Sequence, residues 1–348
     1  MIKEIAIKNF KSIVDLKLPL GRFNLFIGAN GSGKSNILEA IAFGAAASSD
    51  KLDFEYFANR GIRVVEPRFM LPAFEDAKEE KIIISVLNGL GKLYNFDIQY
   101  NRNRKPSYWE NANANIEEND YKIIPSFPEL NQFLIYSLEE SKLRKADDSN
   151  RTFPLGLHGE GLFAYLKALV QRSDSVEIFN EIKENLKVLD WFDDMNLPTE
   201  QLSNEFNIQL KDSYLSETIN TFDQRSTNEG FLYLLFYLTL IVSDETPPFF
   251  AIENIDTAFN PKLCREVTRR LIELARKHDK QIIATTHNPA ILDGLDLSDN
   301  EQKLMVVQRS VDGYTKVRTL NNKDIVKNEP PLSQLWLRGF IGGLPNNF

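Results

Sequence analysis

The sequence is poor in the features that mark cross-linked, metal-bound or membrane-embedded proteins. Its 348 residues include one cysteine, Cys264, which excludes an internal disulfide and a cysteine-based metal site. The longest apolar run, residues 231–242, is shorter than the about 20 residues that a membrane-spanning helix needs. No charged-then-apolar leader opens the chain. These absences predict a cytoplasmic protein with no membrane partner.

An excess of positive charge is also missing. The formal net charge is −8, which argues against a surface that holds nucleic acid by bulk electrostatics but leaves room for a local basic groove. The apolar fraction of 43% and the charged fraction of 26% are those of an ordinary globular chain. No sustained heptads interrupt the middle of the chain, so we expect one α/β core with a compact insertion.

The strongest signal lies in residues 23–43. An apolar run at 23–27 predicts a buried strand, and apolar residues at 37, 38, 41 and 42 recur at helical spacing. Between them, residues 28–35 match G-x-x-x-x-G-K-[ST] at every position. The glycines let successive N–H groups turn inward around an anion, the lysine charge reaches the outer phosphates, and the serine hydroxyl is placed to ligate Mg²⁺. The predicted nucleoside triphosphate ligands are Gly28, Ala29, Asn30, Gly31, Ser32, Gly33, Lys34, Ser35 and Asn36.

The first 36 residues resemble the opening of the RecF, SMC and OLD group of ABC-type ATPases. Their alternating pattern predicts two strands before the P-loop strand, joined by a turn, Asn9-Phe10-Lys11-Ser12, that matches the group's NF(K/R)S turn. The resemblance implies that Lys11 and Ser12 lie near the nucleotide base and ribose; a solvated hairpin is the alternative.

The same resemblance implies the fold class and the ligands. We expect an α/β P-loop NTPase of ABC-ATPase type that binds ATP and Mg²⁺. Its mixed central sheet is flanked by helices, and segments 81–86 and 93–100 build an extra antiparallel sheet. A compact helical subdomain, including a helix over 173–189, is inserted. One head would fill residues 1–348, with an N-terminal lobe (1–150), the insert (151–225) and a C-terminal lobe (226–348).

Several isolated polar residues are candidates for ligand contacts. Basic residues at 59–63 and 102–105 could touch phosphates, but we favour solvated loops for them. Gln132 is the nearest candidate for a Q-loop glutamine. His158 precedes an amphipathic helix and is either a sensor of nucleotide or partner or a structural turn residue.

The segment Arg225-Ser226-Thr227-Asn228-Glu229-Gly230 precedes a wholly apolar run and resembles the ABC signature loop and its helix. The resemblance implies that a partner subunit's loop caps the γ-phosphate, through a serine hydroxyl and the N–H groups of a helix N-terminus. The usual serine-glycine-glycine is absent, so either Ser226 or Asn228 takes the serine's place, and an ordinary capped helix is the alternative. The candidates are Ser226, Asn228, Glu229 and Gly230.

An apolar strand at 249–252 ends in Glu253, which matches the Walker B position. A carboxylate at the end of a buried parallel strand next to the P-loop strand can reach the Mg²⁺ held by Ser35. The family usually has aspartate then glutamate, but here the pair is Glu253-Asn254, and an amide accepts no proton. Asp256 could supply the missing base. We predict slow turnover; the alternative is that Asn254 positions water adequately.

The remaining motifs complete the resemblance. Residues 257–261 resemble the D-loop, and an amphipathic helix follows over 262–278. A buried strand ending in His287 matches the switch strand and H-loop, whose histidine contacts the γ-phosphate. An edge hairpin is expected over 304–308 and 314–319, and the apolar tail from 335 either packs on its own core or docks a partner. The predicted catalytic residues are Lys34, Glu253, Asn254, Asp256 and His287.

The resemblance implies a homodimer linked by ATP. Compact ATPases of this kind are similar to bacterial anti-phage and restriction-linked ATPases, including the RloA-like type, which work with a separately encoded TOPRIM-like or HNH nuclease. No nuclease constellation is visible here, so we expect a sensor or regulator of such an effector. Two alternatives remain: a RecF-like repair ATPase acting on nucleic acid directly, and a nucleotide-bound scaffold without turnover.

Overall fold

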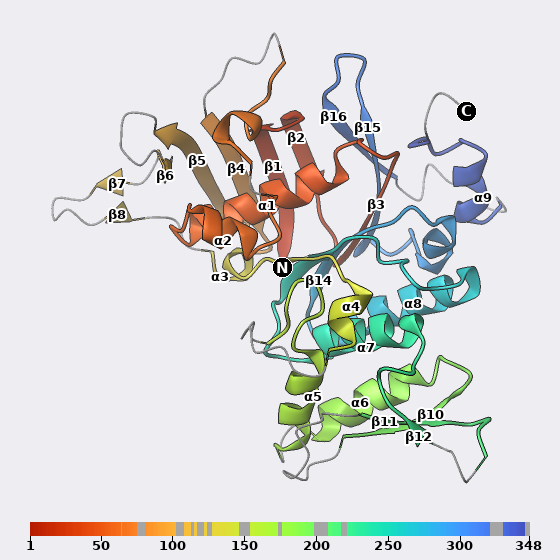
Figure 1. Ribbon diagram of the computed structural model, residues 1–348. Coiled ribbons are helices and arrows are strands. Elements are labelled where there is room, and N and C mark those ends of the chain that lie inside the picture. The colour runs from red at the N-terminus through yellow and green to blue at the C-terminus, as the bar shows by residue number, and fades with distance from the viewer. Residues whose placement is uncertain are drawn as a thin grey trace.

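The computed structural model describes residues 1–63, 65–74, 81–101, 108–112, 115–116, 122–123, 127–145, 154–172, 176–197, 208–216, 221–320 and 330–344. In Figure 1, α1 (Lys34–Ser48) and the strands of residues 2–19 and 81–101 lie in the upper part of the molecule, whereas the helices of residues 162–170, 176–186, 229–242 and 261–277 lie below. Among the described residues, no helix is long and apolar enough to cross a membrane.

The central sheet has six strands in the order β16-β15-β3-β14-β13-β9. Five strands run parallel, and β16 pairs antiparallel with β15 at the edge, which confirms the predicted mixed sheet and edge hairpin. Strands β3, β13 and β14 are buried along their whole length, as expected when helices cover both faces. The strands are β3 (Phe23–Ile27), β9 (Ile135–Tyr136), β13 (Phe249–Ile252), β14 (Gln281–Thr285), β15 (Gln302–Arg309) and β16 (Thr315–Leu320).

One expectation about this sheet is wrong. The strand that ends before Glu253, β13, was expected beside the P-loop strand β3, but β14 lies between them. Ile282 of β14 pairs with Phe23 of β3, and Phe250 of β13 pairs with Ile282 from the other side. The chain leaves β13, crosses the sheet through α8 (Pro261–Lys277) and returns as β14, so β14 takes the slot beside β3.

A second, antiparallel sheet has the order β2-β1-β4-β5-β6, which confirms the extra sheet. Its strands alternate buried and exposed residues because one face packs on α1. Gly44 of α1 lets the helix approach the sheet closely, since a Cβ there would lie 2.8 Å from Ile84. The strands are β1 (Ile2–Phe10), β2 (Ile13–Pro19), β4 (Lys81–Asn88), β5 (Leu93–Asn101) and β6 (Tyr108–Asn111), and a small pair β7 (Asn115–Ile116) and β8 (Lys122–Ile123) lies outside this sheet.

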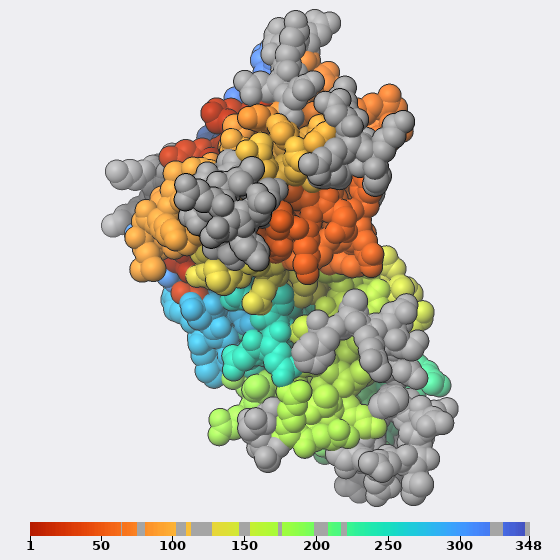
Figure 2. Space-filling view, turned by 90° about the vertical axis from the view of Figure 1, so that its left-hand side faces the viewer, coloured from red at the N-terminus to blue at the C-terminus, as the bar shows by residue number. Residues whose placement is uncertain are grey.

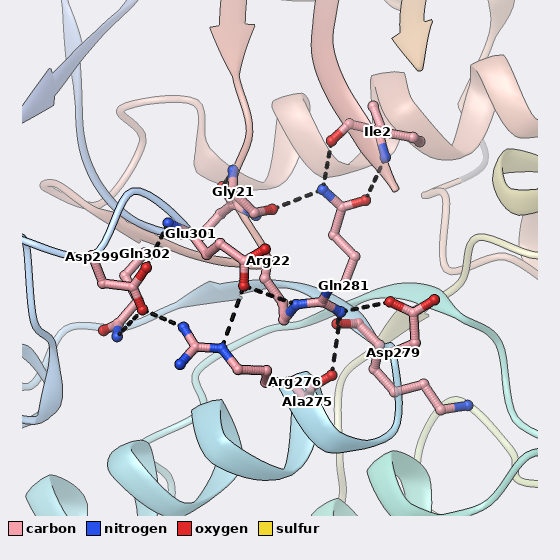
Figure 3. Close-up of polar contacts among 12 residues, drawn as sticks. Ile2, Gly21, Arg22, Ala275, Arg276, Asp279, Gln281, Asp299, Glu301 and Gln302 are labelled. Carbon is pink, nitrogen blue, oxygen red and sulfur yellow. Dashed lines mark hydrogen bonds and ion pairs between the residues drawn. The ribbon is translucent and has the colours of Figure 1, made fainter. Parts of the chain in front are cut away.

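Polar contacts fasten the two sheets together (Figure 3). The side-chain amide of Gln281, at the start of β14, accepts from the Ile2 N–H at 2.9 Å and donates to the Ile2 and Gly21 carbonyls at 2.8 and 2.7 Å. Arg22 donates to Glu301 at 3.2 Å. Gly21 has no room for a side chain, because a Cβ would lie 2.3 Å from the Glu301 carbonyl oxygen. The antiparallel sheet is therefore held in a fixed position relative to the P-loop strand.

Two long helices pack below the central sheet. Helix α7 (Glu229–Val242) is buried all round, whereas α8 is amphipathic, as its sequence predicted. Both begin at an asparagine cap: Asn228 accepts from the Phe231 N–H at 2.9 Å, and Asn260 accepts from the Leu263 N–H at 3.0 Å. The shorter helices are α2 (Phe54–Ala58), α3 (Pro128–Asn131), α4 (Glu140–Leu143) and α9 (Leu332–Leu337), with 3-10 turns η1 (Pro67–Phe69) and η3 (Pro289–Gly294).

The insert is not wholly helical, contrary to the sequence-based expectation. It contains α5 (Leu162–Val170) and α6 (Val176–Leu186), and also a three-stranded sheet of β10 (Phe192–Asn196), β11 (Gln209–Asp212) and β12 (Thr221–Phe222). The helix expected over 173–189 ends at Leu186, and residues 173–175 lie outside the described residues. Figure 2 shows the insert below the α1 region. The lobe boundaries at 150 and 225 stay predictions.

The apolar tail packs on the protein's own core within the described residues. Leu335, Trp336 and Ile341 are buried, with at most 5% exposure. Leu337 and Phe340 remain 64% and 71% exposed. The burial confirms the first of the two interpretations of the tail, and docking of a partner stays a prediction.

Candidate nucleotide-binding site

The P-loop needs glycine at positions where neighbouring strands leave no space. Gly28 has φ 152°, and a Cβ there would lie 2.1 Å from the Val307 carbonyl oxygen of β15. Gly33 has φ 109°, and a Cβ there would lie 2.1 Å from the Thr315 hydroxyl of β16. L side chains rarely adopt these backbone angles. The loop is thus held against the β15–β16 hairpin by backbone contact.

A cavity of about 430 Å³ opens at the carboxyl ends of the central strands. In α/β sheets this edge is where ligands bind. The cavity brings together residues from three of the predicted motifs, the P-loop, the Walker B position and the H-loop. Its lining comprises Asn30, Gly31, Ser32, Gly33, Lys34, Ser35, Asn36, Arg63, Glu253, Asn254, Thr285, His287 and Arg309.

Lys34 is a buried cation held by the loop itself. Its Nζ donates to the carbonyls of Gly28 at 2.7 Å and Ala29 at 3.1 Å. Burial lowers the pKa of Lys34 to about 8, and the nearby charge of Glu253 acts in the opposite direction. Ser32 adds a buried hydroxyl for which the described residues provide no hydrogen-bond partner. A polyanion in this cavity would satisfy both groups.

Ser35 and Glu253 meet directly. The Ser35 hydroxyl donates to Glu253 Oε1 at 2.5 Å, so the end of β13 reaches the first turn of α1 although β14 intervenes. The described residues contain no group of three or more His, Cys, Asp or Glu side chains that could hold a metal ion. Mg²⁺ prefers oxygen ligands, and in nucleotide sites waters and phosphate oxygens fill most of its coordination positions. The Ser35 hydroxyl and the Glu253 carboxylate are therefore suitable protein ligands for Mg²⁺.

Asn254 and Asp256 are oriented differently. Asn254 has φ 51°, lines the cavity, and donates its N–H to the Thr285 hydroxyl at 3.0 Å. Asp256 accepts a hydrogen bond from the Thr286 hydroxyl at 2.6 Å and is not part of the cavity lining. The neutral amide therefore faces the cavity, whereas the acid proposed to replace the family's base binds the end of β14.

His287 lies at the cavity rim, two residues beyond the end of β14. Partial burial lowers its pKa below the usual value, the positive charge of Lys34 lowers it further, and Asp256 acts in the opposite direction. The imidazole is therefore mainly neutral at pH 7. It shares one cavity with Lys34 and Glu253, the arrangement on which the sequence-based site depended.

The signature-like residues lie elsewhere in this chain. Ser226, Asn228, Glu229 and Gly230 are all absent from the lining of the P-loop cavity. Asn228 and Gly230 line another cavity, of about 670 Å³, beside α8. Ser226 is exposed and bonded to Asp223 at 3.3 Å, while Asn228 caps α7. A contact between this segment and a nucleotide on a second copy stays a prediction.

Lys11 and Ser12 have partners within the fold. Lys11 forms an ion pair with the buried Glu39. The Ser12 hydroxyl lies 2.7 Å from the Thr315 hydroxyl and accepts a bond of 2.7 Å from the Asn36 amide. These contacts join the N-terminal hairpin, the P-loop helix and the C-terminal hairpin, and neither Lys11 nor Ser12 lines the cavity.

The other isolated candidates are not brought to the cavity. Gln132 is exposed at the C-terminal cap of α3, and His158 bonds the Ser137 carbonyl at 2.8 Å. Neither residue lines the P-loop cavity. In the 59–63 segment, Arg63 lines the cavity and pairs with Glu39. The 102–105 cluster lies outside the described residues.

Sequence reasoning missed four residues at this edge. Thr285 bonds the backbone of Asn254, and Thr286 bonds the carboxylate of Asp256. Their position just before His287 in the sequence could have identified them as site residues. Arg309 and Thr315 touch the P-loop from the C-terminal hairpin. No local pattern assigned those two, because their role depends on β15 pairing with β3.

Comparison with known proteins agrees with this geometry. Residues 23–293 match the protein family described as "AAA domain, putative AbiEii toxin, Type IV TA system". The DNA replication and repair protein RecF of Glaesserella parasuis serovar 5 is 41% identical over 87 residues, which are 24% of this chain and 22% of RecF. The OLD nuclease of Thermus scotoductus is 46% identical over 41 residues, 12% of this chain and 8% of the nuclease. These matches span less than a quarter of either relative.

Solved structures match over almost the whole chain. An SMC head bound to the C-winged helix domain of ScpA has a TM-score of 0.56 at 16% identity and covers 93% of this chain and 99% of its own. The SMC head domain from Thermotoga maritima has a TM-score of 0.52 at 14% identity, covering 92% and 99%. At these identities the likeness shows the fold alone. The family match and the fold together identify the chain as a member of the AAA family named above, and as an ABC-type ATPase of the RecF, SMC and OLD group.

Proposed function

We propose that this ATPase binds ATP and Mg²⁺ in the P-loop cavity. The observation that carries the proposal is the 2.5 Å hydrogen bond between Ser35 and Glu253, which joins the P-loop helix to the end of β13. Lys34 lines the same cavity. A hydroxyl, a carboxylate and a buried ammonium at one strand edge are the groups that a magnesium-bound triphosphate requires.

Each group has a distinct role in the proposed site. The N–H groups of residues 28–33 and the N-terminus of α1 would bind phosphate oxygens. Lys34 would exchange its two carbonyl partners for a phosphate oxygen. Ser35 and Glu253 would hold Mg²⁺, which when bound neutralises phosphate charge. His287 would contact the γ-phosphate from the rim.

We infer that turnover is slow. Asn254 occupies the position where the group usually has a proton-accepting glutamate, and an amide can orient water but not deprotonate it. Asp256 is engaged by Thr286 and does not line the cavity, so it would have to reorient to act as base. The ATP-bound state would then persist.

A second copy would complete the site. The segment before α7 contains the exposed Ser226 and the helix cap Asn228, and neither residue lines its own chain's P-loop cavity. Ser226 or Asn228 of a second copy could then cover the γ-phosphate, which makes ATP the link of a homodimer.

We further propose that the dimer regulates a separately encoded effector, a TOPRIM-like or HNH nuclease, in anti-phage defence. The proposal is supported by the family description, which names a putative AbiEii toxin and a type IV TA system. Leu337 and Phe340 offer exposed apolar surface near the P-loop. Aspartate at both positions should abolish effector binding and leave ATP binding intact, whereas Trp336→Ala should lower the melting temperature because Trp336 is buried.

The first test is ATP binding by the full chain, measured calorimetrically with Mg²⁺. Lys34→Ala should abolish binding, whereas Glu253→Gln should preserve binding and block hydrolysis. ATP should drive the Glu253→Gln variant into a dimer, as measured by light scattering. Equal ATP binding by native chain and Lys34→Ala would contradict the proposed site.

A RecF-like repair function is the second candidate, favoured by the 41% identity to RecF over 87 residues. In that case the isolated chain should bind DNA with steep salt dependence. Charge reversal at 102–105 should remove this binding. Effector-dependent activity without DNA binding would reject the repair function.

A further inference from the structure

The P-loop cavity contains a cation that no predicted motif includes. Three cationic side chains line the cavity: Lys34, Arg63 and Arg309. Arg63 pairs with Glu39, a carboxylate that it shares with Lys11, and Lys34 has Glu253 nearby. Within the part of the chain that the structure describes, no carboxylate lies within ion-pair distance of Arg309, so its charge is balanced by no side chain there.

The partners of Arg309 are backbone carbonyls. Its Nε donates to the Gly31 carbonyl of the P-loop at 2.9 Å, and its Nη1 donates to the Gly313 carbonyl in the turn after β15. A carbonyl satisfies a donor without cancelling the charge. Lys34 shows the same pattern on the other side of the loop, with Nζ resting on the carbonyls of Gly28 and Ala29. Two cations therefore rest on the carbonyls of one anion-binding loop.

The pairing of β15 with the P-loop strand β3 fixes the position of Arg309. Strand β15 runs parallel to the P-loop strand, and Val306 pairs with Ile27. This pair is the last one before both strands reach the carboxyl edge of the sheet. Just beyond it, Gly28 packs against the Val307 carbonyl. Arg309 follows two residues later, at the last position of β15. The strand pairing holds the base of this side chain beside the residues that would bind phosphate.

Another arginine shows what a purely structural role looks like. Arg144 also donates to backbone carbonyls, those of Gln224, Arg225 and Thr227 at 3.0 to 3.1 Å. It differs from Arg309 because it has an acid partner, Glu140 at 2.6 Å, and lines no part of the P-loop cavity. The charge of Arg144 is thus balanced by Glu140, and its role is to hold backbone carbonyls. The charge of Arg309 is balanced by no carboxylate of the described residues, and Arg309 lines the cavity that would bind the phosphates.

We propose that Arg309 is a second cationic ligand of the triphosphate, supplied by the same chain from β15. The inference rests on the proposed ATP site and adds a contact that the P-loop, Walker B and H-loop motifs do not contain. A guanidinium presents five donors in a planar fork, so Arg309 can bind a phosphate oxygen while keeping one bond to the loop. Its charge-assisted bond would favour the outer phosphates, which carry the most charge.

The test compares ATP and Mg²⁺ binding by four full-length variants. Arg309→Gln removes the charge but keeps an amide that can donate to the Gly31 carbonyl, and should weaken ATP binding about 10-fold to 100-fold. Arg309→Lys keeps the charge and should lose less. Arg338→Gln is the matched control, because Arg338 lines only the neighbouring cavity, and its affinity should equal that of the native chain. Lys34→Ala reports on the proposed site itself.

The salt dependence of ATP binding distinguishes a charge contact with the phosphates from a brace, a contact that only supports the loop. The loss in Arg309→Gln should shrink when salt rises from about 0.05 M to about 0.5 M, because screening removes the advantage of the native chain. A loss that is equal at both salt concentrations, or equal in Arg309→Lys, would make Arg309 a brace for the loop and overturn the inference. Native affinity in Arg309→Gln would also overturn it. If the native chain itself bound no ATP, or Lys34→Ala bound it normally, the proposed site would fail instead.

Discussion

The P-loop and the segment at the start of α7 are held in place in different ways. The P-loop is enclosed by distant parts of the chain: Gly28 touches Val307, and Gly33 touches Thr315. The segment at 225–230 has fewer such contacts: Asn228 caps its own helix, and one distant side chain, Arg144, donates to the carbonyls of residues 224, 225 and 227. The P-loop is thus enclosed by its own chain, whereas the segment at 225–230 lies outside the P-loop cavity. The proposed role of the P-loop can therefore be tested in a monomer, whereas the proposed capping role of the segment at 225–230 needs a second copy.

The largest effect should come from breaking the enclosure of the P-loop. Gly33→Ala places a Cβ 2.1 Å from the Thr315 hydroxyl at a φ of 109°, so it should abolish ATP binding and lower the free energy of unfolding by about 3 kcal/mol. Gly31→Ala is the matched control, because its φ of 74° is αL-like and no atom lies within 4 Å. It should cost about 1 kcal/mol. Calorimetry and urea unfolding measure both, and equal costs would refute the steric argument.

The next largest effect concerns catalysis in the P-loop cavity. Asn254→Glu restores a proton acceptor in the cavity and should raise the hydrolysis rate at least about 10-fold, since a positioned general base contributes about 10²- to 10⁴-fold. Asp256→Ala should change the rate little, because Asp256 binds Thr286 rather than lining the cavity. Steady-state phosphate release measures both rates. A large loss in Asp256→Ala with no gain in Asn254→Glu would assign the base to Asp256.

A smaller effect should come from substitutions in the segment at 225–230. Asn228→Ala removes the cap of α7 and should cost about 1 kcal/mol of stability. Ser226→Ala removes only an exposed bond to Asp223, so the free energy of unfolding should stay within about 0.5 kcal/mol. In a Glu253→Gln background, at least one of the two changes should weaken the ATP-linked dimer while each monomer still binds ATP. Sedimentation measures the dimer, and unchanged dimerisation in both variants would reject the signature assignment.

The smallest effect is a pH dependence of stability from Lys34. Its pKa is about 8 in the folded chain and about 10.5 when unfolded, so between these values the unfolded chain binds more protons. The free energy of unfolding should therefore rise with pH across this window, and the cost of the buried charge should be complete below it. Lys34→Met should show a shallower rise in urea unfolding. Some rise should remain, because burial also lowers the pKa of Lys280 to about 8.

The elements of the site could be predicted because their signals are local. Glycine spacing marked the P-loop, and buried strands ending in Glu253 and before His287 marked two further motifs. The sheet order could not be predicted in the same way, since β14 rather than β13 lies beside β3. The three-stranded sheet of the insert was missed because its strands are short and carry little pattern.

Which residues can bind phosphate follows from the sequence alone, because a P-loop is a local arrangement of backbone angles that glycines allow. The sequence also shows that Asn254 is no base, since this follows from amide chemistry alone. The contacts of Ser35 with Glu253, of Asp256 with Thr286 and of Arg309 with Gly31 depend instead on the tertiary fold. Those contacts join segments up to 278 residues apart. Strand pairing and packing bring them together, and no local pattern records the outcome.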